Sequence, residues 1–84
     1  MFYVYVLKSL KDNNLYFGST NDLRRRLSEH NSKKVKSTKS RAPLELKYYE
    51  AYCSEKDARD REWSLKKDGR ALSQLKRRIP ESLK

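Results

Sequence analysis

Apolar residues change their spacing several times along the chain, and each change marks an expected element. Phe2 to Lys8 has β-branched and aromatic residues on both faces, which predicts a central strand covered on both sides. Residues 11–14 are Lys-Asp-Asn-Asn, and they favour a turn because Asn and Asp tolerate left-handed backbone conformations. Strand character resumes over 15–17 and is expected to stop at Gly18. Together these segments predict a β-hairpin.

The next segments alternate between helical and extended spacing. Leu23 and Leu27 lie one helical turn apart within a helix expected over 21–30, with Thr20 or Asn21 as its N-cap. After Pro43, apolar residues at every second position predict a strand with one buried face. That strand is expected to contain Leu44, Leu46 and Tyr48 on the buried face.

The C-terminal part of the chain is expected to form two helices. Ser54 opens a capping-box sequence, which predicts a helix that runs to about Lys67 and stops at Asp68-Gly69. A last helix with one apolar side is expected to end before Pro80. The element order ββαβαα, with no repeat and no long linker, predicts one α+β domain over residues 1–84.

Charge points to an anionic partner. The chain has 84 residues and a formal net charge of +10, from 21 Lys and Arg against 11 Asp and Glu. Half of that excess lies in residues 32–43, which contain no acidic residue. The five cations of this segment are Lys33, Lys34, Lys36, Lys39 and Arg41. A solvated connector is one interpretation; the lack of acids favours a phosphate-contacting loop that gives affinity without reading bases.

Several classes of protein are excluded or disfavoured. No apolar run approaches the roughly 20 residues of a membrane-spanning helix. The first residues lack the basic region and cleavage site of a signal peptide, so a cytoplasmic protein is expected. One cysteine, Cys53, excludes an internal disulfide and a multi-cysteine zinc site. No glycine-rich phosphate loop, Ser–His–Asp order or HExxH motif is present, and no organic cofactor is expected.

Two tyrosines and two basic residues are candidates for chemistry. Tyr5 and Tyr16 lie on the two strands of the hairpin, and strand alternation decides whether they share a face. For most tyrosines the ordinary interpretation is packing with the hydroxyl at the rim. Arg26 and His30 lie four residues apart on the apolar stripe of the first helix. The alternative for His30 is a boundary cation near the helix C-terminus.

Glu62 is the most informative acid. It shares the apolar stripe of the second helix with Ala58 and Leu65, where a carboxylate costs free energy unless it is paired or binds a cation. A salt bridge to Arg26 or a neighbour is one interpretation. The other is a ligand for a hard divalent metal such as Mg²⁺. Trp63 faces another direction and is interpreted as a packing residue.

In order and spacing, these motifs resemble the GIY-YIG endonuclease superfamily over about residues 2–79. The matching segments are Tyr3-Val4-Tyr5, Tyr16-Phe17-Gly18, Ser19 to Leu23, Arg26, His30, the basic loop and the helix from Ala58 to Glu62. The chain is most similar to the small, stand-alone, single-domain members. Their fold is a three-stranded antiparallel sheet flanked by helices, which agrees with the order ββαβαα.

The resemblance implies a metal-dependent endonuclease that hydrolyses DNA phosphodiester bonds. Tyr5 and Tyr16 match the family's two tyrosines, either of which is a candidate general base, and Arg26 matches the arginine that clamps the phosphate. His30 matches a position that orients a tyrosine or relays its proton, and Glu62 matches the glutamate that holds one Mg²⁺ or Mn²⁺ ion. The implied substrate is DNA, branched or single-stranded, in repair or recombination, with RNA as an alternative.

Two departures from the family pattern leave a second function open. The first motif contains no glycine, and no Asn follows Glu62 at the usual family position, where Ser73 and Gln74 are the nearby polar residues. The alternative is therefore a catalytically weak or inactive nucleic-acid-binding module. Because the sequence contains no separate DNA-recognition domain, low sequence specificity or structure specificity is expected. The sequence sets no oligomeric state.

Overall fold

Three antiparallel strands form one sheet in the order β2-β1-β3 in the computed structural model, which describes residues 1–84. The elements are β1 (Phe2–Ser9), β2 (Leu15–Thr20), α1 (Leu23–Asn31), β3 (Leu44–Tyr52), α2 (Glu55–Lys67) and α3 (Gly69–Arg78). The predicted α+β class and the order ββαβαα are confirmed. None of the helices has both the length and the apolar composition needed to cross a membrane.

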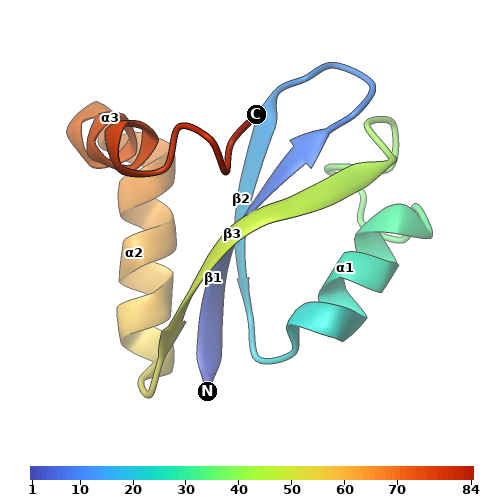
Figure 1. Cartoon of the computed structure of the whole chain (residues 1–84). Helices are drawn as coiled ribbons and strands as arrows, with labels where there is room; N and C mark the ends of the chain where they lie inside the picture. Colours follow the sequence, from blue (N-terminus) through green and yellow to red (C-terminus); the bar gives the residue numbers. More distant parts are fainter.

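The sheet lies between two helical layers. Figure 1 shows α1 on one face and α2 with α3 on the other. Successive side chains of β1 point to opposite faces, so this central strand contributes to two cores. Val4 and Val6 pack with buried residues of α2 and α3, whereas Tyr5 and Leu7 pack on the side of α1. The prediction of a strand covered on both sides is confirmed.

The hairpin turn forms as its residues predict. Asn13 has a φ of 62°, the left-handed conformation that Asn tolerates. Its neighbour Asn14 donates its backbone N–H to the Asp12 carboxylate at 2.8 Å. The second strand continues to Thr20, beyond its expected end at Gly18, because Gly18 is paired with Tyr5 inside the ladder. In β2 the glycine therefore allows the Tyr5 side chain to come close to the backbone, and it does not end the strand.

A β-bulge changes which side of β3 is buried. Val6 pairs with Tyr48 and Leu7 pairs with Leu46, which leaves Lys47 as an extra residue. Because an extra residue reverses the alternation of side chains, Leu46 packs on the side of α1 and Tyr48 packs against the other core. The prediction that Leu44, Leu46 and Tyr48 share one buried face is therefore wrong.

Short polar side chains cap the helices. Asp22, rather than Thr20 or Asn21, is the N-cap of α1 and accepts the Arg25 N–H at 3.0 Å. Ser54 caps α2 as predicted, accepting the Asp57 N–H at 3.2 Å. Asp68 closes α2 and also caps α3, so the helices meet at a single residue.

A carboxylate network ties β3 to α2. Glu50, whose side chain is 16% exposed, accepts hydrogen bonds from the Tyr48 and Tyr52 hydroxyls and from the Arg61 guanidinium at 2.9 and 3.1 Å. Burial alone raises the pKa of a carboxyl group, but here the hydrogen bonds from Arg61, Tyr52 and Tyr48 outweigh burial and hold the pKa of Glu50 below its usual value. The network fixes α2 against the sheet, and with it the side chains that α2 presents at the edge of β2.

Candidate active site

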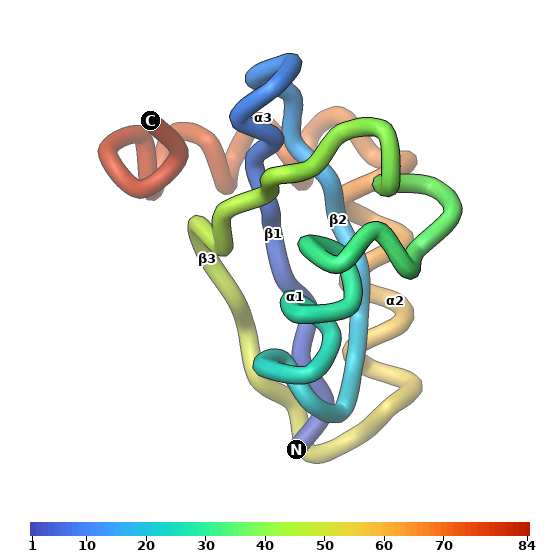
Figure 2. Tube along the Cα trace, turned by 90° about the vertical axis from the view of Figure 1, so that its right-hand side faces the viewer, coloured from blue at the N-terminus to red at the C-terminus, as the bar shows by residue number.

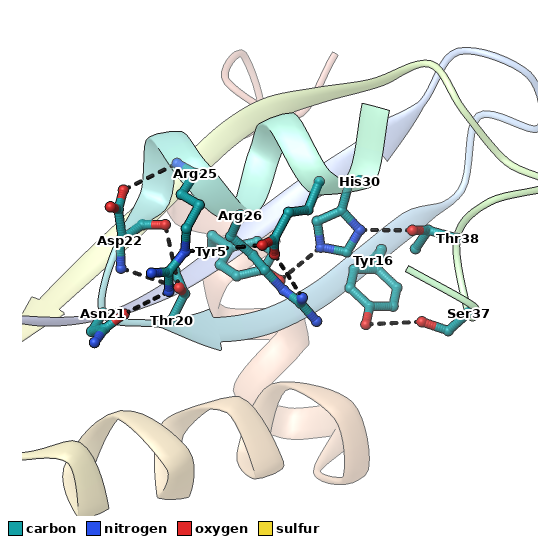
Figure 3. A network of polar contacts seen from close by, with 11 residues as sticks. Tyr5, Tyr16, Thr20, Asn21, Asp22, Arg25, Arg26, His30, Ser37 and Thr38 are labelled. Carbon is teal, nitrogen blue, oxygen red and sulfur yellow. Dashed lines mark hydrogen bonds and ion pairs between the residues drawn. The ribbon is translucent and has the colours of Figure 1, made fainter. Parts of the chain in front are cut away.

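Tyr5 and Tyr16 share the face of the sheet that α1 covers. Tyr5 pairs with Gly18, and Tyr16 lies two residues earlier in β2, opposite Leu7. Both phenol rings contact the imidazole of His30 edge to face, with centroid separations of 5.7 Å for Tyr5 and 5.2 Å for Tyr16. Figure 3 shows His30 reaching from α1 toward both rings. The hairpin and the first helix therefore meet at this histidine.

Gly18 is required by the position of Tyr5. A Cβ atom at residue 18 would overlap the Tyr5 hydroxyl and the ring carbon that carries it. No glycine of the chain has a positive φ, so the requirement is steric and not conformational. The Tyr5 side chain lies directly over the glycine of the second motif and is 2% exposed.

A chain of polar contacts runs through the buried histidine. The Tyr5 hydroxyl lies 2.9 Å from Nε2 of His30, and Nδ1 of His30 lies 2.7 Å from the Thr38 hydroxyl. Burial and the positive charge of Arg26 lower the pKa of His30, so the ring is neutral at pH 7. The histidine is fully buried. The alternative of a boundary cation near the helix C-terminus is therefore wrong.

The positions of the protons in these polar contacts follow from the groups around Tyr5 and His30. Burial raises the pKa of Tyr5 to about 12, and the neighbouring Arg26 guanidinium opposes the rise only in part. Arg26 can only donate hydrogen bonds. Nε2 of His30 is the acceptor within reach of the buried Tyr5 hydroxyl, so we assign the phenol as the donor to Nε2 and Nδ1–H as the donor to Thr38. Tyr5 is a neutral, fixed hydroxyl at physiological pH.

Tyr16 has a different environment. Its side chain is only partly buried, and its hydroxyl lies 3.2 Å from the hydroxyl of Ser37 in the loop between α1 and β3. The ammonium of Lys66, on α2, lies 5.8 Å from the centre of the Tyr16 ring. The phenol thus stands at the open edge of β2, between the basic loop and α2.

Glu62 reaches the same strand from the opposite face of the sheet. Its Oε1 accepts the Ser19 hydroxyl at 2.5 Å, and its Oε2 accepts the Lys66 ammonium at 2.6 Å. The expected salt bridge exists, with Lys66 as the partner. Arg26 instead donates to Glu29 at 3.0 Å. Because β2 is an edge strand, Lys66 reaches around it and links the two residues: its ammonium binds Glu62 and lies 5.8 Å from the centre of the Tyr16 ring.

A groove of about 310 Å³ opens beside these residues at the end of β2. Its walls include Arg25 and Arg26 from α1, Arg59 from α2, and Ser19, which joins the groove to Glu62. The pKa of Arg26 is raised, first by the hydrogen bond to Glu29. Two carboxylates also line the groove and pair with these guanidinium groups, Glu29 with Arg25 and Arg26, and Glu55 with Arg59. The guanidinium N–H groups that the carboxylates leave unused suit an anionic ligand such as a phosphodiester.

Glu62 fits a metal site that uses a single carboxylate. The chain has no group of three His, Cys, Asp or Glu side chains that would form a protein cage for an ion. Mg²⁺ is often held by one or two carboxylates, with water and phosphate oxygens as its other ligands. The carboxylate of Glu62 already has a cationic partner, Lys66, and the Ser19 hydroxyl fixes its orientation. One hard cation fits this carboxylate only where it replaces the Lys66 ammonium as the partner of Glu62.

The basic loop borders the candidate site. Figure 2 shows residues 32–43 beside β2, and Ser37 and Thr38 contact Tyr16 and His30. The segment forms turns and bends and no regular element, as its composition predicts. Four of its cations are exposed, namely Lys33, Lys34, Lys36 and Lys39.

Arg41 differs from the four lysines. Its Nε donates to the Asp12 carboxylate at 2.8 Å, and its terminal nitrogen donates to the carbonyls of Asn14 and Leu15. Its side chain is 23% exposed. Arg41 therefore holds the loop to the hairpin turn, a structural contact that the charge count alone does not reveal.

Comparison with known proteins places the chain in a family. The model of the GIY-YIG catalytic domain matches residues 1–78. The chain belongs to the GIY-YIG family. It is 46% identical over 65 residues to a UPF0213 protein of Bacillus pumilus, a match covering 76% of this chain and 65% of that protein. The chain thus spans just under two thirds of that relative.

Two further relatives also match most of the chain. The chain is 40% identical over 74 residues to the UPF0213 protein YazA of Bacillus subtilis, which covers 87% of this chain and 74% of YazA. It is also similar to the solution NMR structure of a UPF0213 protein from Bacillus halodurans, with 37% identity and a TM-score of 0.53. That match covers 89% of this chain and 82% of the other. The GIY-YIG fold therefore extends over nearly the whole chain.

Sequence reasoning missed several residues of this GIY-YIG domain. Arg25 points away from the apolar stripe of its helix, which favours surface charge, yet it lines the groove. Lys66 lies four residues after Glu62 and forms an ion pair with it. This spacing favours ion pairs on a helix, so the sequence could have indicated Lys66 as the partner of Glu62. Trp63 is 62% exposed, so its interpretation as a packing residue is wrong.

The contact between Gly18 and Tyr5 gives a stability test. Replacing Gly18→Ala forces the Tyr5 ring away from β2, and we expect the free energy of unfolding to fall by about 1–3 kcal/mol, the usual cost of overpacking. Gly69→Ala is the matched control, because a Cβ at residue 69 meets no atom within 4 Å. Urea unfolding of both variants measures the difference. An equal stability of the two would show that Tyr5 does not need the glycine.

Proposed function

We propose that this GIY-YIG domain is a metal-dependent endonuclease that hydrolyses phosphodiester bonds in DNA. One observation carries the proposal: Tyr16, Arg26 and Glu62 lie around the edge strand β2, beside a groove that Arg26 lines. Phosphodiester hydrolysis needs an activated water, in-line attack, and neutralisation of charge on the phosphoryl and leaving oxygens. Each of these needs has a candidate group at this edge.

Arg26 is the proposed phosphate clamp. Its guanidinium lines the groove, and one terminal nitrogen is held by Glu29 at 3.0 Å. The remaining N–H groups are able to donate to two non-bridging oxygens, and such charge-assisted pairs are strong and directional. Donors already in position when negative charge develops in the transition state lower its free energy without reorganisation.

Tyr16 is the proposed general base, and Tyr5 is a positioning residue. A base must reach the attacking water and must give up its own proton before it takes another. Tyr5 is buried, donates to His30 and has its pKa raised to about 12, so both conditions fail for it. Tyr16 is partly open to solvent and lies beside the Lys66 ammonium. His30 holds the two rings at fixed separations.

Glu62 is the proposed ligand for one Mg²⁺ or Mn²⁺ ion. When bound, such an ion supplies neutralisation of charge on the phosphoryl and leaving oxygens. The chain's own contribution is to orient the carboxylate, through the hydrogen bond from Ser19 and the ion pair with Lys66. Because both are cations, a bound ion would compete with Lys66 for the Glu62 carboxylate.

The proposed substrate is DNA bound mainly through its backbone. Lys33, Lys34, Lys36 and Lys39 are exposed next to Tyr16, where they would meet phosphates on one side of the cut. Phosphate contacts position a nucleic acid but carry no sequence information. This supports low sequence specificity or selection by DNA structure, in repair or recombination.

A second candidate function is nucleic-acid binding without cleavage. Both carboxylate oxygens of Glu62 have protein donors, Ser19 and Lys66, which favours a site that holds no metal. The exposed lysines would then bind the backbone in the same way. Cleavage assays separate the two functions.

The nuclease proposal predicts metal-dependent cleavage that fails when the clamp or the ligand is removed. We expect nicking of branched, flapped or single-stranded DNA with Mg²⁺ or Mn²⁺, and none with EDTA. Arg26→Ala and Glu62→Ala should each reduce the rate by at least about 100-fold, since each removes charge stabilisation from the transition state. Arg24→Ala, an exposed residue of the same helix, should cleave like the wild type. Unchanged cleavage in both site variants would refute the proposal. Including RNA among the substrates measures the preference between DNA and RNA.

The basic loop predicts the salt dependence of binding. Changing Lys33, Lys34, Lys36 and Lys39 to Gln should weaken DNA binding and flatten the plot of log affinity against log salt by about 0.7–0.9 for each phosphate that the loop no longer neutralises. Fluorescence anisotropy in EDTA measures this slope. The control changes Lys56 and Lys84 to Gln, because both are exposed and paired with acids of their own helix or C-terminal turn. Equal slopes in both variants would exclude the loop as the phosphate-contacting surface.

A further inference from the structure

Trp63 is a large aromatic side chain left in solvent. It is the single tryptophan of the chain, and it is 62% exposed on the outer side of α2. The residues of α2 that face the core are Ala58 and Leu65, each 1% exposed. The indole therefore contributes little to the fold, and tryptophan with one apolar face in water is enriched at binding surfaces.

Helical spacing places Trp63 next to a residue that lines the groove. Arg59, four residues earlier, and Lys66, three residues later, are its neighbours on the surface of α2. Arg59 lines the groove, and Lys66 donates to Glu62 at 2.6 Å and lies 5.8 Å from the Tyr16 ring centre. The exposed indole therefore lies one helical turn beyond the groove-lining Arg59 and next to the ion pair of Lys66 with the candidate metal ligand.

The charges around Trp63 decide what kind of partner fits. Lys66 and Lys67 follow it within one turn, and Arg59 lies one turn before it. The acids on this side of the helix are each paired with a cation, Glu55 with Arg59, Asp60 with Lys56, and Glu62 with Lys66. An aromatic face with cations on either side suits a nucleotide, because a base stacks on the ring while the phosphates meet the cations. Bases inside a duplex are already stacked on each other and are not free to do this.

We infer that Trp63 is a stacking platform for an unpaired base next to the cleavage site. The substrate would then carry single-stranded nucleotides beside the bond that is cut. The placement of this base relative to the cut rests on the proposed nuclease function. The stacking itself needs neither metal nor cleavage, so it is measured separately.

The single tryptophan makes the test direct, since all indole emission reports on Trp63. The wild-type protein in EDTA is titrated with oligothymidylate and, separately, with a blunt duplex of equal length. We expect the single strand to quench most of the indole fluorescence and the duplex to quench little. By anisotropy of the labelled strand, Trp63→Ala should bind it about tenfold more weakly, while Trp63→Phe should recover most of that loss.

Tyr49→Ala is the matched control. Tyr49 is 52% exposed on β3, the opposite edge strand of the sheet, and its ring packs on Tyr3. This variant should bind the single strand within about twofold of the wild type. A tenfold loss in Tyr49→Ala as well would overturn the assignment, because the effect would then be a general one of exposed aromatic residues.

The remaining outcomes are also decisive. Quenching that is absent, or equal for single strand and duplex, overturns the stacking role, whether or not the enzyme cleaves DNA. Quenching confined to the single strand supports it, even where no metal yields cleavage, in which case the nuclease proposal alone fails. Circular dichroism of Trp63→Ala verifies that the variant remains folded, as expected for an exposed position.

Discussion

The contact of Tyr5 with Gly18 is the constraint on which the candidate site depends. Because the buried phenol lies directly over the glycine, β2 is fixed in register against β1, and Tyr16 falls on the same face of the sheet. The Tyr5 hydroxyl then bonds to His30, whose other nitrogen bonds to Thr38. One buried side chain thus joins the hairpin, the first helix and the basic loop. Because Tyr5 is buried and held by these contacts, we assign the role of general base to the more exposed Tyr16.

The edge of the sheet explains how residues from two layers meet. Arg26 comes from α1 and Glu62 from α2, and these helices cover opposite faces. Inside a sheet the strands would keep such side chains apart. At β2 no further strand intervenes, so both reach the same groove region. An unpaired edge is a liability for aggregation in most proteins; here the edge is bordered by cations, which suit a polyanionic substrate.

Elements specified by local chemistry were predictable from the sequence. The left-handed turn at Asn13, the Ser54 cap and the stripe that contains Ala58 and Glu62 all depend on neighbours within a few residues. The β-bulge at Lys47 was not predictable, because it depends on pairing between strands about 40 residues apart. The same reason applies to the ion pair of Arg41 with Asp12 and to the network around Glu50. The five candidate site residues came from spacing and family resemblance. The structure brings them together around β2, with Tyr5 and His30 buried, and their roles in chemistry stay predictions.

The most direct test compares the two tyrosines. Single-turnover cleavage of a flapped DNA substrate with Mg²⁺ is measured for Tyr5→Phe and Tyr16→Phe, after urea unfolding has shown that both variants are folded under the assay conditions. Loss of the general base should lower the rate of Tyr16→Phe by about 10²–10⁴-fold. Tyr5→Phe keeps the ring over Gly18 and loses only the bond to His30, so its rate should fall by no more than about tenfold. The reverse order, with Tyr5→Phe inactive and Tyr16→Phe active, would contradict the division of roles between the fixed and the open tyrosine.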